Sequence, residues 1–428
     1  MAARPRTLRP VPPPEERQAP RPRARHKHGP EALLIGVVMA LVCFGTVMVY
    51  SSSSSRAFLE DGDPLRFVKR QVVFAILGVG AYWLCTRMDI RVLKRIAGPF
   101  MGLTVVLLLA VLLPGIGQEI NGSKRWLPMP VIGQLQPSEL AKFALVLWIA
   151  AAVARDPKRV ATLRGMVPYL AVTGLLSVLI LAEPDLGTAS TLFLVALAVL
   201  LVAGAQQKHV AAVFAGAIAL SGLAIAAAPY RRDRLFAFLD PMSDPDGIGF
   251  QTLQAQIALG SGGLTGKGLG DGVQKAFYLP EAHTDMILAT IGEELGVVGV
   301  WLVLAAIGLI AMLAYRIALD CADLHRRLVA TGIATLIAVQ GLDNIAAVLG
   351  AFPITGVPLP FVSYGGSSLI VLLASIGILV NIARSGNQHA ARQHSTQQAG
   401  PRGDRGRGDG RPRDAGAGGG RSAARAGR

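Results

Sequence analysis

Long apolar stretches separated by short polar segments dominate the chain between residues 32 and 383. A helix needs roughly 20 predominantly apolar residues to cross the hydrocarbon core of a bilayer. By that criterion the pattern predicts ten membrane-spanning helices, which centre on residues 32–51, 69–86, 96–114, 138–154, 166–182, 186–204, 209–228, 286–314, 327–349 and 366–383. Only Glu183, Pro184 and Asp185 separate the fifth from the sixth. The predicted fold is therefore all-α and polytopic.

Composition agrees with a membrane protein and argues against a soluble one. Hydrophobic residues make up 52% of the chain and the mean hydropathy is +0.48. The net charge of +15 is concentrated in the two ends and in short loops, which is typical of a topology signal and not of nucleic-acid binding. We expect a disordered basic tail over 1–30, a membrane domain over 31–385, and a disordered Gly/Arg-rich tail over 386–428. The first apolar run is predicted to be an anchor and not a cleaved signal.

The distribution of Lys and Arg predicts the orientation in the membrane. Basic residues follow the second, fourth, sixth and eighth predicted spans, on the same side as both tails. The positive-inside rule places that side in the cytoplasm. Segments 52–68, 115–137, 183–185, 229–285 and 350–365 would then lie outside. The three cysteines predict no disulfide framework.

The segment from Gln274 to Gly296, QKAFYLPEAHTDMILATIGEELG, gathers ionisable residues beside a long apolar run. Such residues at a membrane boundary are costly to desolvate, which makes them functional candidates. Asp285 lies where the apolar run begins, so its carboxylate is the candidate catalytic group. The alternative is that Thr284 or His283 caps a helix and Asp285 merely offsets the helix dipole.

Two groups of basic residues on the predicted outer side break the charge bias. Lys124 and Arg125 form the first group, and Arg231 and Arg234 belong to the second. Arg suits phosphate oxygens through its planar fork of donors. Because both groups lie on the side of the acidic segment, they favour an anion site there over plain solvated charge.

Two irregular segments flank the candidate site. Gly260–Gly272 lacks the surrounding βαβ unit of a phosphate-binding fingerprint, so we expect a mobile loop that leads to the acidic segment. Pro353–Ser368 contains three prolines and three glycines just before the last span. Irregular backbone near membrane depth is tolerated where it lines a cavity. We therefore expect this loop to wall the site, with Ser363 and Ser367 as candidate substrate-binding hydroxyls.

Several motifs together resemble the SEDS family (shape, elongation, division and sporulation). They are QKAFYLPEAHTD, IGEELG, EPDLGTA, NGSKRWL with QPSELAKFALV, and PLPFVSYGGSS, in order, within roughly residues 32–384. The resemblance implies ten transmembrane helices and polymerisation of peptidoglycan glycan strands from lipid II outside the cytoplasmic membrane. It also implies that Asp285 is the essential acidic residue.

Within that family the motifs resemble the FtsW branch, which acts in cell division, more than the RodA branch, which acts in elongation and cell shape. QKAFYLPEAHTD, EPDLGTA and VMVYSSSS are similar to FtsW, whereas PITGVPLPFVSYGGSS is closer to RodA. Division proteins often have Lys where this chain has Thr355. An FtsW-like polymerase is the favoured interpretation and a RodA-like polymerase the alternative.

The implied reaction assigns roles to the candidate residues. A sugar 4-hydroxyl of one lipid II attacks the anomeric carbon of the growing strand, and undecaprenyl diphosphate leaves. Asp285 would be the general base. Lys124, Arg125, Arg231 and Arg234 would bind the diphosphate. Further substrate-binding candidates, in direct contact or supporting a contact, are Lys275, Glu281 and His283; Glu293 and Glu294 are interpreted as structural.

No cofactor is certain from the sequence. A divalent cation (Mg²⁺ or Mn²⁺) between Asp285 and the diphosphate stays an open alternative, although no cluster with metal-ligand spacing is present. The resemblance implies lipid II as substrate, a class B penicillin-binding protein (a transpeptidase) as partner, and other divisome proteins. A lipid II flippase without chemistry and a recruiting scaffold are the competing hypotheses.

Overall fold

The computed structural model describes residues 30–398, except 121–122, 130–132, 228, 244, 246, 248 and 277. A long helix lies at each of the ten predicted spans. They are α1 (Pro30–Asp61), α2 (Arg66–Arg87), α3 (Ile90–Leu112), α4 (Pro137–Val153), α5 (Leu163–Ala182), α6 (Leu186–Val202), α7 (Gln207–Ala227), α10 (Ile287–Leu319), α11 (Leu324–Val348) and α12 (Gly366–Gln398). Within the described residues, eight helices are long and apolar enough to cross a membrane. The predicted all-α membrane fold is confirmed.

The remaining elements are short and lie between these helices. A three-stranded antiparallel sheet has the order β1-β2-β3, and the sequence pattern had not predicted it. The short elements are β1 (Gln118–Ile120), β2 (Ser123–Met129), β3 (Gly133–Leu135), η1 (Pro157–Ala161), α8 (Pro229–Leu239), η2 (Pro241–Ser243), α9 (Phe250–Gly262) and η3 (Gln274–Ala276). α12 continues past residue 385, where the tail was predicted to start.

Capping residues explain why closely spaced helices separate where they do. α5 ends at Ala182, and the side chain of Asp185 accepts a hydrogen bond of 2.9 Å from the backbone N–H of Thr188 at the start of α6. A side-chain acceptor at this position satisfies a donor that the helix itself leaves unpaired. The boundary between the fifth and sixth predicted spans is therefore confirmed.

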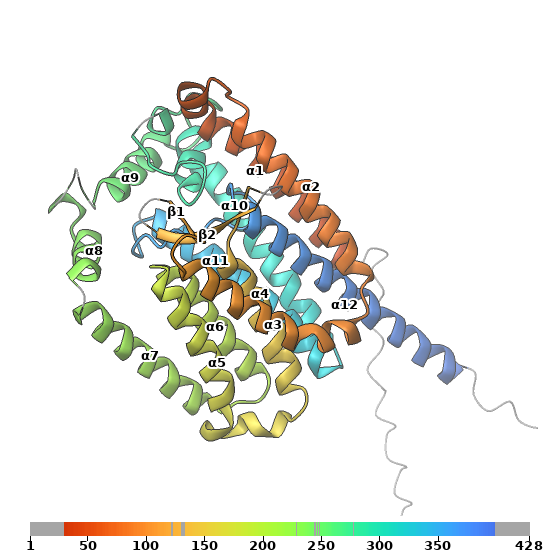
Figure 1. The fold of residues 1–428 in the computed structure, drawn as a ribbon. Coiled ribbons are helices and arrows are strands. Elements are labelled where there is room, and N and C mark those ends of the chain that lie inside the picture. Colours follow the sequence, from red (N-terminus) through yellow and green to blue (C-terminus); the bar gives the residue numbers. More distant parts are fainter. Residues whose placement is uncertain are drawn as a thin grey trace, which may run out of the picture. The chain divides into compact units, whose positions relative to one another are not determined.

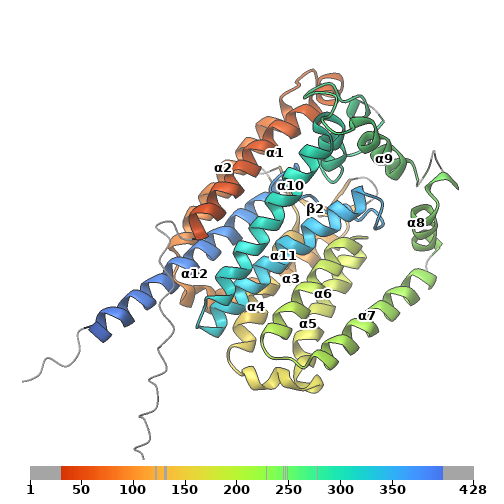
Figure 2. The same cartoon turned by 180° about the vertical axis from the view of Figure 1, so that it is seen from behind.

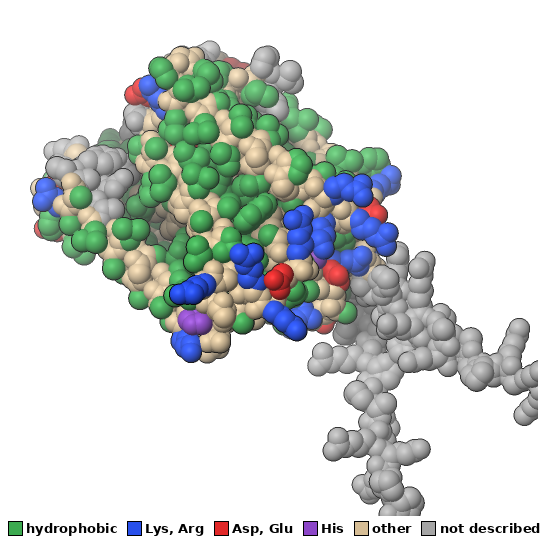
Figure 3. All heavy atoms as spheres, turned by 60° about the horizontal axis from the view of Figure 1, so that its bottom comes forward, with side chains coloured by type: hydrophobic (Ala, Val, Ile, Leu, Met, Phe, Trp, Pro, Cys, Tyr) green, Lys and Arg blue, Asp and Glu red, His purple; other side chains and the backbone are tan. Residues whose placement is uncertain are grey.

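The helix ends define two opposite faces (Figures 1 and 2). We call the end that carries the described residues of segments 62–65, 113–136, 183–185, 240–286 and 349–365 the cavity face, and the other end the basic face. Lys and Arg side chains gather on the basic face, with few acidic ones among them (Figure 3). This arrangement groups the loops as the charge pattern groups them along the sequence, except that residues 52–61 belong to α1 and residues 229–239 to α8.

The centre of the bundle is built from α4, α11 and α12. In the most apolar 18-residue stretch of each helix, 72% is buried in α11 and in α12, whereas none is buried in α7. α4 is buried on nearly all sides, so Lys142 reaches only protein groups. Its Nζ donates to Glu139 Oε1 at 2.7 Å and to Gln340 Oε1 at 3.1 Å. A buried charge is tolerable when it is paired in this way.

α10 is interrupted at Gly296, where φ is 67°. The break frees the carbonyl groups of Glu293 and Glu294, which accept hydrogen bonds of 3.0 Å from the backbone N–H groups of Lys267 and Gly268. A Cβ at Gly266 would lie 2.1 Å from Glu294 O, so only glycine permits this approach. The prediction that Gly260–Gly272 is a mobile loop was wrong. The segment packs against α10, because its glycines allow the two backbones to come into contact.

Candidate functional site

The cavity face contains a cavity of about 940 Å³. Its walls come from the end of α1, the start of α2, the small sheet, α9, the segment before α10 and the loop before α12. Stretches that are distant in the sequence therefore meet around one space. The volume is within the range of about 300–1,000 Å³ that is typical of ligand sites.

Asp285 lies in the wall of this cavity with 9% of its surface exposed. α10 begins only at Ile287, and its N-cap residue Met286 makes no side-chain capping bond. The prediction that Thr284 or His283 is the N-cap was therefore wrong, because both precede the N-cap position; an effect of Asp285 on the helix dipole stays a prediction. The Asp285 carbonyl accepts a 2.7 Å hydrogen bond from the side-chain amide of Asn344 in α11.

Asn344 is a site residue that the sequence did not reveal. It is 2% exposed, and its Nδ2 donates both to Asp285 O and, at 2.9 Å, to Val357 O. One buried amide thus ties the segment before α10 to the loop before α12. The loop is also joined to the segment by a 2.9 Å bond from Tyr364 N to His283 O. An asparagine within an apolar span was the available sequence signal.

The environment of Asp285 shifts its ionisation into the neutral range. Burial, reinforced by the Glu281 carboxylate, raises the pKa of Asp285 to about 7. Burial lowers the pKa of His283 to about 4, so its imidazole is neutral at pH 7. The His283 ring centroid lies 4.4 Å from that of Phe67. A carboxylate with a pKa near the working pH is suited to general base catalysis.

Glu281 lies in a tight turn beside Asp285. Its φ is 54°, a left-handed conformation that non-glycine residues seldom adopt. The Glu281 carbonyl accepts from the N–H groups of Thr284 at 3.0 Å and Met286 at 3.3 Å. The Thr284 hydroxyl lies 3.0 Å from Glu281 Oε2 and 3.3 Å from Asp285 Oδ1, and so bridges the two acids. Unusual backbone held by several bonds is common at active sites.

Arg125 reaches the cavity from β2 and is held rigidly there. Its Nε donates to Glu183 O at 2.8 Å, its Nη2 donates to Pro184 O, and its Nη1 lies 3.9 Å from Asp185 Oδ2. A Cβ placed on Gly356 would lie 3.7 Å from Arg125 Nη1 and 4.0 Å from Asp285 Oδ2. Arg125 and Asp285 therefore approach the same small space beside Gly356.

Three further arginines line the cavity and were missed from the sequence: Arg56 in α1, and Arg66 and Arg70 in α2. Arg66 and Arg70 are four residues apart, so they share one face of the helix. Like Arg125, Arg56 and Arg66 are basic residues in a segment that was predicted to be external, so the same exception to the charge bias could have identified them. Arg70 falls inside the second predicted span, where a basic residue was the available signal.

The other residues that were predicted to bind substrate differ in whether they line the cavity. Glu281, His283 and Ser367 line the cavity, and Ser367 Oγ accepts a 3.0 Å bond from Gln136 N. Ser363 does not line it, and its Oγ accepts from Leu359 N at 2.8 Å. Lys124 points elsewhere, half-exposed, with Glu119 Oε2 at 3.9 Å.

Lys275 is also absent from the cavity wall. It is buried and forms an ion pair with Glu294 in α10. This position does not support direct substrate contact, because the ammonium is used within the protein. Arg231 and Arg234 belong to α8, but their side chains lie outside the described part of the chain, so their predicted role stays a prediction.

The described residues contain no group of three or more His, Cys, Asp or Glu side chains that could hold a metal ion. Mg²⁺ is often bound by only one or two carboxylates together with substrate phosphates. Asp285 and Glu281, bridged by Thr284, are the carboxylates in this cavity that would fit such an ion. The cation hypothesis stays a prediction that depends on the diphosphate for its other ligands.

Comparison with known proteins identifies similar chains. Residues 31–388 match the family model FtsW/RodA/SpoVE, described as "Cell cycle protein". The chain is 42% identical over 354 residues to a probable peptidoglycan glycosyltransferase FtsW of Trichlorobacter lovleyi, covering 82% of this chain and 93% of the relative. It is 39% identical over 361 residues to stage V sporulation protein E of Bacillus subtilis, covering 84% and 98%.

Two solved structures are similar in both fold and sequence. One was described as "Structural coordination of polymerization and crosslinking by a peptidoglycan synthase complex"; its matching chain has a TM-score of 0.68 and 31% identity, with 83% of this chain and 98% of that chain covered. The other is the rod shape determining protein RodA of Thermus thermophilus, with a TM-score of 0.61, 30% identity, and coverage of 82% and 96%.

Proposed function

Because the chain belongs to the FtsW/RodA/SpoVE family of cell cycle proteins, we propose that it is a peptidoglycan glycosyltransferase that polymerises lipid II. The observation that carries the proposal is that Asp285 and Arg125 both line the cavity and approach the same point beside Gly356. A base next to a fixed positive charge is what glycosyl transfer with a diphosphate leaving group requires.

The proposed orientation places the cavity outside the cytoplasmic membrane. The basic face would be cytoplasmic according to the positive-inside rule, with both termini on that side. The lipid tails of the substrates would stay in the bilayer while their sugars and diphosphates enter the cavity. In a bacterium with two membranes, this location is the outer surface of the inner membrane.

In the proposed reaction, Asp285 accepts the proton of the sugar 4-hydroxyl as the hydroxyl oxygen bonds to the anomeric carbon of the growing strand. The bond from that carbon to the diphosphate oxygen breaks at the same time, and undecaprenyl diphosphate leaves with the electron pair. Arg125 would stabilise the departing diphosphate from the sheet side, through the Nη1 end of its guanidinium. Arg66 and Arg70 would bind phosphate from the α2 side.

The arrangement of the arginines gives the Arg125 assignment a specific test. Arg125→Lys keeps the charge but cannot reproduce the bonds to both Glu183 O and Pro184 O, so we expect only partial activity. Arg125→Ala should weaken lipid II binding more strongly. The exposed Lys124→Ala is the matched control, because its side chain lies next to Arg125 in sequence and outside the cavity wall.

Purified protein in detergent or liposomes, supplied with fluorescent lipid II, tests the enzyme directly. Glycan chains resolved on a gel and digested by a muramidase would support the polymerase. Transfer of lipid II across the bilayer without any glycan product would instead support the carrier hypothesis. The cavity is lined by cavity-face segments, which favours the enzyme, since a carrier needs access from both sides.

We further propose a role in cell division with a class B penicillin-binding protein as partner. Relatives at about 40% identity are named FtsW, whereas the solved RodA is 30% identical, and this difference favours the division branch. The similar synthase complex is described as coordinating polymerization and crosslinking. Purification of tagged protein from native membranes should recover a single-pass transpeptidase and divisome proteins; recovery of elongation proteins alone would favour the RodA branch.

A further inference from the structure

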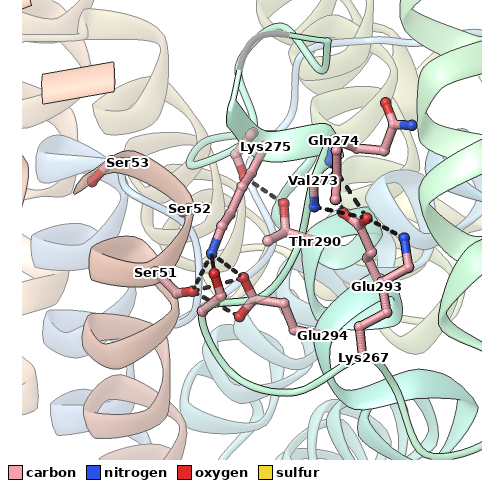
Figure 4. A network of polar contacts seen from close by, with 12 residues as sticks. Ser51, Ser52, Ser53, Lys267, Val273, Gln274, Lys275, Thr290, Glu293 and Glu294 are labelled. Atoms are coloured by element: carbon pink, nitrogen blue, oxygen red, sulfur yellow. Dashed lines mark hydrogen bonds and ion pairs between the residues drawn. The ribbon is translucent and has the colours of Figure 1, made fainter. Parts of the chain in front are cut away.

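A cluster of polar side chains, all but one of them buried, fastens the glycine-rich segment to α10 (Figure 4). It consists of Ser51 in α1, Lys267 and Lys275 in the segment before the site, and Glu293 and Glu294 in α10. We call these five residues the loop clamp. None of them lines the cavity.

The Glu294 half of the loop clamp joins three elements. The carboxylate is fully buried and accepts from Ser51 Oγ at 2.7 Å and from Lys275 Nζ at 2.5 Å. Lys275 Nζ also donates to Ser51 Oγ at 3.0 Å and to Gly270 O at 2.8 Å. All three protons of the ammonium group therefore have acceptors, and α1, the loop and α10 meet at one ion pair.

In the other half of the loop clamp, Glu293 binds the same loop at different residues. This carboxylate is also fully buried and accepts from Lys267 Nζ at 2.8 Å and from Val273 N at 2.9 Å. Gln274 N lies 3.1 Å from Glu293 Oε2. Two adjacent glutamates of α10 thus fix both ends of the segment from Lys267 to Lys275.

The clamped part of α10 is a short rigid unit that ends at the candidate base. The break at Gly296 separates residues 287–295 from the rest of the helix. At about 1.5 Å per residue this piece is about 13 Å long. Asp285 lies just before its N-terminal end, and the two clamping glutamates lie at its C-terminal end. A tilt of this piece would therefore move Asp285 relative to Arg125.

We propose that the loop clamp positions Asp285 for catalysis, an inference that rests on the proposed glycosyltransferase function. Burying two carboxylates and an ammonium brings little net stability, since a buried ion pair often contributes no more than apolar residues of the same size. The geometric effect of the loop clamp is larger, because the clamp fixes residues 287–295 of α10 and the loop to α1. Misplacement of a catalytic group by about 1 Å can reduce a rate by about 10²-fold.

The first test removes both charges of the Glu294 pair together. Lys275→Met with Glu294→Gln leaves no unpaired charge in the interior, so the protein should still fold. We expect lipid II turnover to fall at least tenfold while the half-saturating lipid II concentration changes less than threefold. Lys69→Met is the matched control, because Lys69 pairs with Asp63 at 2.8 Å on the exposed surface of the same face. Unchanged turnover in the double variant would overturn the proposal.

A disulfide can replace the ion pair and separate tethering from charge. An ideal Cβ at Gly272 would lie 3.2 Å from Glu294 Cγ, close to where a cysteine sulfur at 294 would be. The variant Gly272→Cys, Glu294→Cys, Lys275→Met, in a background without the native cysteines, should be slow when reduced. Its turnover should recover to within threefold of the parent when oxidised. A verified disulfide with no recovery would overturn the positioning role.

Hydrogen–deuterium exchange provides a readout that does not depend on activity. In the double variant, the amides of Lys267 and Gly268, which bond to the carbonyls of Glu293 and Glu294, should exchange faster than in the parent. Unchanged exchange there would overturn the clamp. A parent protein that polymerises no lipid II would refute the proposed function instead, so the two failures are distinguishable.

Discussion

Glycan polymerisation should become faster as the pH rises through neutrality, because Asp285 accepts a proton only when it is ionised. Its pKa is raised to about 7 by burial and by Glu281. A group with that pKa is roughly 9% ionised one unit below it and roughly 91% ionised one unit above it. The turnover rate should therefore rise about tenfold between about pH 6 and pH 8. A carboxylate with the usual pKa of 3.8 would give a flat profile over this range.

The variant Glu281→Gln identifies the group that produces this profile. Removing the Glu281 charge removes one cause of the raised pKa, while burial remains, so the midpoint should move to lower pH but stay above 3.8. Initial rates with fluorescent lipid II at saturating concentration, measured from about pH 5 to pH 9, give both midpoints. A flat parent profile, or a midpoint that moves upward in the variant, would refute the assignment of Asp285 as the base.

Three other substitutions test separate parts of the structure. Burial, reinforced by Asp185, raises the pKa of Glu183 from 4.5 to about 8, so its stabilising contribution is complete below pH 4.5 and is lost as the pH rises through about 8. Glu183→Gln should therefore unfold at a higher temperature than the parent at alkaline pH. An unfolding temperature equal to or below that of the parent would contradict this. Gly356→Ala places a methyl group between Arg125 and Asp285 at a φ of +75°, which costs about 1–2 kcal/mol of strain, and turnover should fall. Lys142→Met leaves Glu139 buried without its partner and should cost about 3–5 kcal/mol in thermal unfolding, with recovery when Glu139→Gln is added.

Hydropathy and charge were sufficient to predict the membrane helices and the grouping of their loops. Most of the apolar runs are long enough to predict a helix by themselves: within the described residues, eight helices are long and apolar enough to cross a membrane. The shorter α6 was located from the polar residues Glu183, Pro184 and Asp185, which separate it from α5. The loop structure was less accessible, since the sheet β1-β2-β3 consists of strands as short as three residues with no regular alternation.

The candidate site was predictable where chemistry is local and missed where it depends on packing. Asp285 and Arg125 stood out because each is an ionisable residue in an unexpected place, and both line the cavity. Lys275 had the same appearance, yet its partner Glu294 lies 19 residues away and Ser51 lies 224 residues away. No sequence pattern reports such distant contacts. The glycine-rich segment was misjudged for the same reason, because its close approach to α10 exists only in the folded protein.

The most direct test of the proposed activity compares the parent with Asp285→Asn in the fluorescent lipid II assay. Asparagine keeps the size of the side chain and can still receive support from its neighbours, but it cannot accept the proton. We predict that polymerisation falls by about 10²-fold or more, while lipid II binding persists because the arginines are unchanged. An Asp285→Asn variant that forms glycan chains at close to the parent rate would contradict the account.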